Sequence, residues 1–181
     1  MEEKQQITKA DRAGFEEATA NMFSNPKYAN DYLFYAHVLA QCRVHFDKTM
    51  QAPAGVNFTY DHYNLYINPD NITDDQGNEH PGFNAIPLEQ RLGILKHEML
   101  HIINLHTKRK EDRDHQGFNI AADCAINQHI ERKHLPEQCI FPDQFPGGNV
   151  DPNQTAEQYY ELLPKDEKDG SGGGGNGGGK V

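Results

Sequence analysis

Hydrophobic residues near the start of the chain recur at three- and four-residue steps, which is the spacing of one face of an α-helix. The pattern predicts helices over residues 10–24 and 28–48. In the second helix the repeated positions, which we expect to form one buried face, are Tyr32, Tyr35, Leu39, Cys42 and Phe46.

Beyond residue 51 the spacing changes to alternation, which is typical of a strand with one buried face. Apolar and polar residues alternate over 56–60 and again over 63–67, and Asp61 and His62 separate the two runs. We therefore predict a β-hairpin, which makes a small sheet near residues 56–68.

A segment rich in Asp, Asn, Gly and Pro follows over residues 71–86 and predicts a loop. Helical spacing returns at Pro87, a residue suited to the first turn of a helix because it has no N–H to leave unpaired. We predict one helix from Pro87 to about His106.

The last part of the chain is also predicted to be helical. A charged turn over residues 107–116 leads into an apolar helix over residues 117–132. A short helix over residues 155–163, capped by Thr155 or Asn153, is expected to close the domain. Together these elements predict an α+β fold that is mostly helical.

Composition sets the domain organisation. The chain has 181 residues, and its end is almost entirely glycine, so that segment has no side chains to bury. We expect one domain over residues 1–165, followed by a Gly-rich disordered tail or linker over residues 166–181.

Charge and cysteine content narrow the function classes. A formal net charge of -10 argues against binding to nucleic acid or to an anionic membrane, since both need a concentrated basic surface. The basic cluster at residues 108–110 is followed by acidic residues, which indicates a solvated loop. Three cysteines without a C-x-x-C spacing fit a reducing compartment, and no apolar run approaches the ~20 residues of a membrane span. We expect a soluble, cytoplasmic protein.

The helix predicted from Pro87 carries a candidate metal site. His97 and His101 are four residues apart, so on a helix they lie one turn and only ~40° from each other. Both imidazoles can therefore reach one cation. Glu98 lies beside them, where its carboxylate can take a proton from water without being a ligand, which is the arrangement of many zinc hydrolases.

A catalytic zinc usually takes a third protein ligand, and two residues compete for that place. On a continuous helix His106 lies roughly 180° from His97, so it could bind only if the helix broke after Ile103, where the sequence holds no breaker. Asp123 is favoured. It belongs to a polar stripe on the following apolar helix, formed by Asn119, Asp123 and Asn127.

Two segments resemble a known family. The first runs from His97-Glu98-Met99-Leu100-His101 through His106 to Asn119-Ile120-Ala121-Ala122-Asp123, and the second is Thr155-Ala156-Glu157 with the residues up to Leu163. Both resemble the metallopeptidase domain that precedes von Willebrand factor A-like domains in bacterial and phage proteins. The resemblance implies a zincin-like fold with His97 and His101 as ligands and Glu98 as general acid/base. His106 and Asp123 both fall on family positions.

The sequence thus predicts a zinc-dependent metallopeptidase that hydrolyses a peptide or protein substrate. Relatives usually continue into the von Willebrand factor A-like domain, whereas this chain stops in a glycine tract that resembles the linker. The resemblance therefore implies a von Willebrand factor A-like domain or another protein as a partner. One alternative is a catalytically inactive zinc-binding module that acts within a larger assembly. Another is a metal-free helical scaffold.

Overall fold

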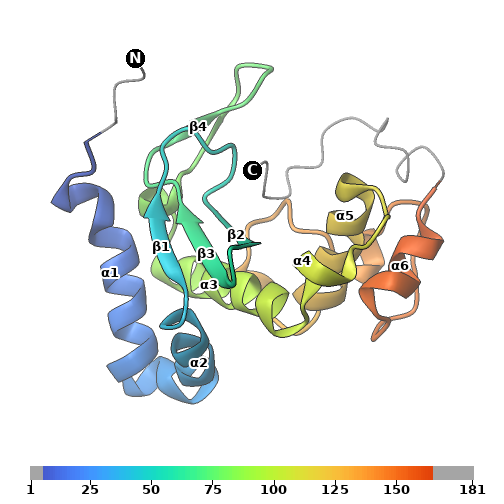
Figure 1. Ribbon diagram of the computed structural model, residues 1–181, viewed down its shortest axis with the longest axis horizontal. Coiled ribbons are helices and arrows are strands. Elements are labelled where there is room, and N and C mark those ends of the chain that lie inside the picture. Colours follow the sequence, from blue (N-terminus) through green and yellow to red (C-terminus); the bar gives the residue numbers. More distant parts are fainter. Residues whose placement is uncertain (1–5, 165–181) are drawn as a thin grey trace. The chain divides into compact units, whose positions relative to one another are not determined.

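The computed structural model in Figure 1 describes residues 6–164. The predicted Gly-rich tail, residues 166–181, lies outside them. The described chain forms two compact units, and the division between them falls between Met99 and Leu100, inside helix α3 (Leu88–Ile103). Its strands are confined to the first unit while helices occur in both, so the fold belongs to the predicted α+β class.

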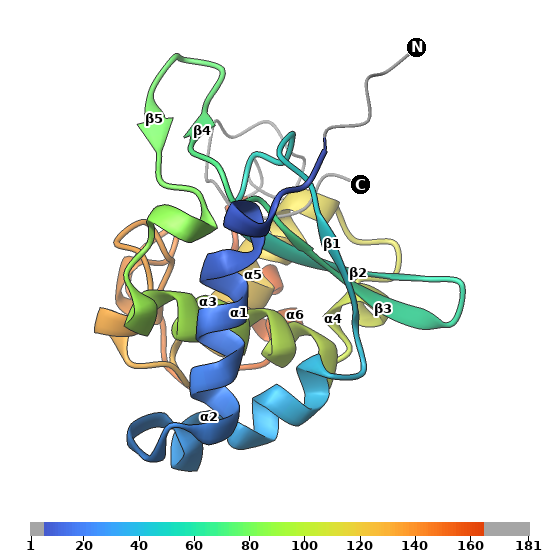
Figure 2. The same ribbon diagram turned by 90° about the vertical axis from the view of Figure 1, so that its left-hand side faces the viewer.

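The first unit begins with helices α1 (Lys9–Ser24) and α2 (Pro26–Leu39), which pack on each other. Asn25 joins them. Its backbone N–H donates to Asn21 O at 3.2 Å to end α1, and its side-chain oxygen accepts from Lys27 N at 3.0 Å to begin α2. Figure 2 shows the chain turning sharply at this joint.

The second predicted helix was wrong in its last turns, because α2 ends at Leu39 and strand β1 (Arg43–Phe46) follows. Within β1, Val44 and Phe46 are less exposed than their neighbours, as the alternation of a strand requires. Cys42 and Phe46 also fit the helical spacing of the preceding residues, so periodicity could not separate the two structures.

The predicted hairpin is confirmed as β2 (Ala54–Thr59) and β3 (His62–Ile67), which pair antiparallel. Its turn consists of Tyr60 and Asp61, one position earlier than expected. Both have positive φ, 51° and 66°, which is the geometry that matches the twist of a tight hairpin. Strand β1 pairs parallel with the other edge of β3, so the sheet order is β1-β3-β2.

The predicted loop after the sheet contains a second, smaller strand pair. Strands β4 (Ile72–Thr73) and β5 (Glu79–His80) are antiparallel, and the short 3-10 helix η1 (Phe83–Ala85) follows. Aromatic contacts then tie α1 to this region, because the ring of Phe15 lies edge-on to Phe46 at 5.9 Å and 6.5 Å from Phe83.

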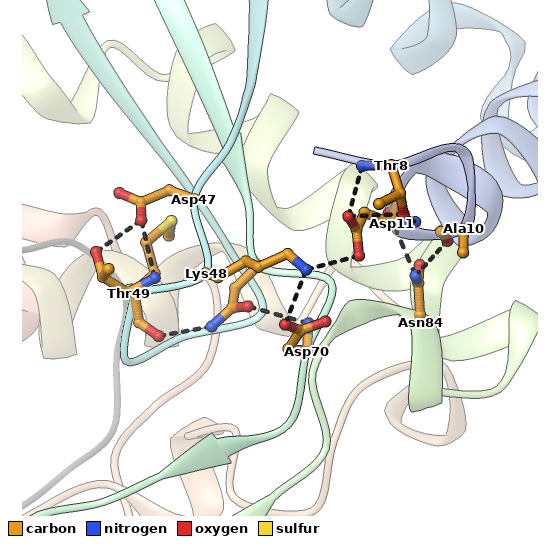
Figure 3. Close-up of polar contacts among 10 residues, drawn as sticks. Thr8, Ala10, Asp11, Asp47, Lys48, Thr49, Asp70 and Asn84 are labelled. Atoms are coloured by element: carbon orange, nitrogen blue, oxygen red, sulfur yellow. Dashed lines mark hydrogen bonds and ion pairs between the residues drawn. The ribbon is translucent and has the colours of Figure 1, made fainter. Parts of the chain in front are cut away.

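A polar network fastens the start of α1 to the loops around the sheet (Figure 3). The Lys48 ammonium lies 2.9 Å from Asp11 Oδ1 and 3.2 Å from Asp70 Oδ2. Thr8 caps α1 and donates to the second oxygen of Asp11, while Asn84 donates to Asp11 O at 3.2 Å. These contacts join residues that are far apart in the sequence.

Over its described residues, the second unit has helices joined by loops and no strand. Beyond the end of α3 it contains α4 (His106–Arg109), α5 (His115–Asn127), the 3-10 helices η2 (Arg132–His134) and η3 (Pro142–Gln144), and α6 (Ala156–Leu162). The helix predicted over residues 117–132 therefore begins and ends earlier than expected. No helix within residues 6–164 has both the length and the apolar character needed to cross a membrane.

Helices α5 and α6 pack around one apolar core. Its fully buried members are Phe118, Ala121, Ala122, Cys124, Ala156 and Tyr159. The N-cap of α6 is Thr155, whose side chain accepts from Gln158 N in a capping box. Packing of the apolar face of α5 in this core fixes the direction of its polar residues, Asn119, Asp123 and Asn127.

Candidate metal centre

Helix α3 presents His97, Glu98 and His101 because its other side is apolar. Leu92, Leu95 and Met99 are completely buried there. His97 and His101 are partly exposed, one turn apart on this continuous helix, and Glu98 is 7% exposed. The division between the compact units falls between the two histidines. Both residues nevertheless belong to one continuous helix, and helical geometry therefore sets their spacing.

Helix α5 returns to this position and supplies Asp123. In the second unit, Asp123 Oδ1 lies 3.0 Å from His101 Nε2, and both side chains are largely buried, with 17% and 13% exposed. One ligand atom from each of His97, His101 and Asp123 lies within 4.8 Å of the other two. Within residues 6–164 this is the group of potential metal ligands that the fold brings together.

The three polar residues of α5 have separate surroundings. Asn127 is almost completely buried and donates to Ile140 O at 2.9 Å, which ties the following loop to the helix. Asn119 Nδ2 lies 3.1 Å from His115 Nδ1, one turn earlier. Asp123 is the member of the stripe that contacts His101.

The helix predicted to continue to His106 was wrong, because α3 ends at Ile103. Leu105 has φ 55° and ψ 32°, a left-handed conformation that reverses the chain. Its N–H donates to Ile102 O at 3.0 Å, and the Asn104 side chain donates to Leu100 O at 2.9 Å. These bonds satisfy carbonyls at the helix end that further helical turns would otherwise pair.

The break places His106 behind the His101 ring. The Nδ1 atoms of the two residues lie 3.1 Å apart, and the rings meet edge-on with centroids 5.1 Å apart. His106 is 5% exposed and does not belong to the three-residue group. Burial, followed by the nearby His101 and Arg109, lowers the pKa of His106 to about 3.

Arg109 and Glu157 were not recognised from the sequence as parts of this region. The basic cluster at residues 108–110 was interpreted as a solvated loop, yet Arg109 Nε donates to Glu157 Oε1 at 2.8 Å and its Nη2 pairs with Oε2. Arg109 Nη1 also donates to Asn104 O at 3.1 Å. The sequence feature that could have pointed to this ion pair was an acidic residue, Glu157, in the first turn of a helix with a predicted N-cap.

The donor set fits zinc. Two imidazole nitrogens and one carboxylate oxygen are ligands that zinc accepts in catalytic sites, where a fourth position stays open for water. The ligand atoms of a tetrahedral zinc lie roughly 3.3 Å apart, since each bond is about 2.0–2.1 Å long. In this structure the three ligand atoms lie within 4.8 Å of one another. Small side-chain movements would therefore bring them to the distances that zinc requires.

A hollow elsewhere in the second unit is separate from these residues. It encloses about 430 Å³ along the loop that follows η2 and is lined in part by Ile130, Phe141, Val150 and Pro152. The Arg132 guanidinium covers the Phe141 ring at 4.1 Å. None of the candidate metal or catalytic residues lines it, so it gives no support for a role in catalysis.

Comparison with known protein families identifies a match over much of the chain. The model of a family described as "Putative metallopeptidase domain" matches residues 61–180. No curated protein and no solved structure matches the chain. The matched segment contains every residue of the candidate metal centre.

Proposed function

Because the chain belongs to the family described as "Putative metallopeptidase domain", we propose that it is a zinc-dependent hydrolase of peptide bonds with a zincin-like arrangement of its site. His97, His101 and Asp123 would hold the ion. The observation that carries this proposal is the approach of Asp123 to His101 at 3.0 Å, with His97 one turn away on α3.

Zinc, when bound, supplies a Lewis acid that makes a water molecule acidic near neutral pH and polarises a carbonyl. Glu98 is the general acid/base. It lies roughly 100° round the helix from His97, beside the ligands. Its carboxylate accepts the proton of the attacking water and returns it to the leaving amine.

Replacement of Glu98 by Gln tests this assignment. Glu98→Gln removes the proton acceptor and keeps the shape of the side chain, so we expect zinc to bind normally while hydrolysis of a labelled unfolded protein falls at least ~100-fold. Metal content is measured by mass spectrometry and activity by release of label. Glu89→Gln, on the same helix, is the matched control and should retain activity.

The other outcomes distinguish the alternatives. Unchanged hydrolysis in Glu98→Gln would refute the mechanism. If the unmodified protein binds zinc but hydrolyses nothing, it is the inactive zinc-binding module of a larger assembly. Absence of stoichiometric zinc, or zinc binding that survives Asp123→Ala, would refute the metal centre itself.

A further inference from the structure

The His101 ring has a polar partner on each side. Its Nε2 lies 3.0 Å from Asp123 Oδ1, on the side of the three-residue group. Its Nδ1 lies 3.1 Å from His106 Nδ1, on the opposite side of the ring. His106 is therefore in contact with the nitrogen of His101 that faces away from Asp123.

The chemistry of imidazole decides which of the two nitrogens donates. A divalent ion needs the lone pair of His101 Nε2, so the single proton of the neutral ring must lie on Nδ1. That N–H then requires an acceptor, and His106 Nδ1 is within hydrogen-bonding distance. His106 in turn must carry its own proton on Nε2.

Three features hold the His106 ring in this position. The left-handed Leu105 turns the chain so that His106 begins α4. The ring packs edge-on to Phe118 of α5, with centroids 6.2 Å apart. Arg109, one turn further along, is paired with Glu157 through two bonds and donates to the carbonyl of the turn itself.

We infer that His106 is a positioning residue: its Nδ1 accepts a hydrogen bond from His101 Nδ1–H and thereby fixes the tautomer and orientation of His101. The inference rests on the proposed metal centre of His97, His101 and Asp123. Residues that accept from the second nitrogen of a ligand histidine typically contribute 10- to 100-fold to metal affinity, roughly the effect expected here.

Two variants of nearly equal shape test the inference. Leu and Asn have the same branching, but only Asn offers an acceptor near the position of His106 Nδ1. In the full chain, His106→Leu should weaken zinc binding roughly 10- to 100-fold, and His106→Asn should restore most of that loss. Zinc affinity is measured by competition with a chromophoric chelator. Equal affinities for the two variants would overturn the inference.

Nitrogen NMR of the unmodified, zinc-loaded protein provides a test that needs no variant. We expect the His101 proton on Nδ1 and the His106 proton on Nε2, and the opposite assignment for either ring would overturn the inference. The zinc can also be replaced by cobalt, whose absorption spectrum reports the number of nitrogen ligands. If the cobalt-substituted His106→Asn variant has one nitrogen ligand fewer than the unmodified protein, His106 is a ligand and the inference is overturned. Failure of the unmodified protein to bind zinc would instead refute the proposed metal centre.

Discussion

At Gly82, just before η1, the backbone leaves space for a hydrogen atom but not for a methyl group. A Cβ added there would lie 1.7 Å from Asp70 O, which is a backbone atom and cannot rotate away. The carboxylate of Asp70 also forms an ion pair with the Lys48 ammonium, in the network that fastens α1. A change at this one residue therefore has to move a segment that several others depend on.

We expect Gly82→Ala to lower the free energy of unfolding by about 3 kcal/mol or more, because overpacking against the backbone forces a main-chain shift. Urea unfolding monitored by circular dichroism measures the change. Gly55→Ala is the matched control, since a Cβ there meets only Met50 Cε at 3.4 Å. Equal stability of the two variants would contradict the close approach at Gly82.

Single residues were predictable where spacing alone fixes their direction. His97 and His101 share one side of a helix whatever surrounds them, and Asp123 was the acidic residue of the polar stripe on the next helix. The contact of His106 with His101 was not predictable, because it depends on a left-handed Leu105. Leucine rarely adopts that conformation, so the sequence carries no signal for it.

Among the elements, the end of α3 is where a local conformational cost can be measured. Leu105 lies in the left-handed region and is 45% exposed, so its side chain contributes little burial. A left-handed conformation costs a residue other than glycine roughly 1–2 kcal/mol. The hydrogen bonds around Asn104 and Arg109 offset that cost.

Leu105→Gly should raise the free energy of unfolding by up to about 1 kcal/mol, because glycine adopts this conformation without strain. Leu105→Val should lower it by about 1 kcal/mol, since a β-branched side chain is least suited to positive φ. Denaturant midpoints of the two variants give the comparison. A stabilising effect of Val would contradict the left-handed conformation at residue 105.

Elements were predicted well where their ends carry a chemical signal. The hairpin and the capped helix α6 have alternation and a capping box, respectively. The change from α2 to β1 has neither a proline nor a glycine at the boundary, and apolar residues continue in helical phase across it. The parallel pairing of β1 with β3 decides that segment, and such a contact is invisible to local pattern.

Over the whole molecule, the ion pairs around Lys48 predict a dependence of stability on pH. The Lys48 ammonium, followed by the backbone N–H of Thr8, lowers the pKa of Asp11 from 3.8 to about 2. Between these values the unfolded chain binds the proton and the folded chain does not. The contribution of Asp11 is therefore complete above about pH 5 and is lost as the pH falls toward 2.

We expect the urea midpoint to decrease between pH 5 and pH 2, and to decrease less steeply in Asp11→Asn. Lys48→Met, which removes the principal cause of the shift, should flatten the same part of the curve while leaving the carboxyl in place. Urea titrations at each pH measure both. If Asp11→Asn has the same slope as the unmodified protein, Asp11 has no lowered pKa.

The sheet order has a practical consequence for anyone who prepares fragments of this protein. The family match begins at residue 61, inside the turn between β2 and β3, and β3 is the central strand. A recombinant piece cut at that boundary would lose both neighbours of β3 and uncover Leu65 and Ile67. Such a bare strand invites aggregation, so residues well upstream of the match should be kept.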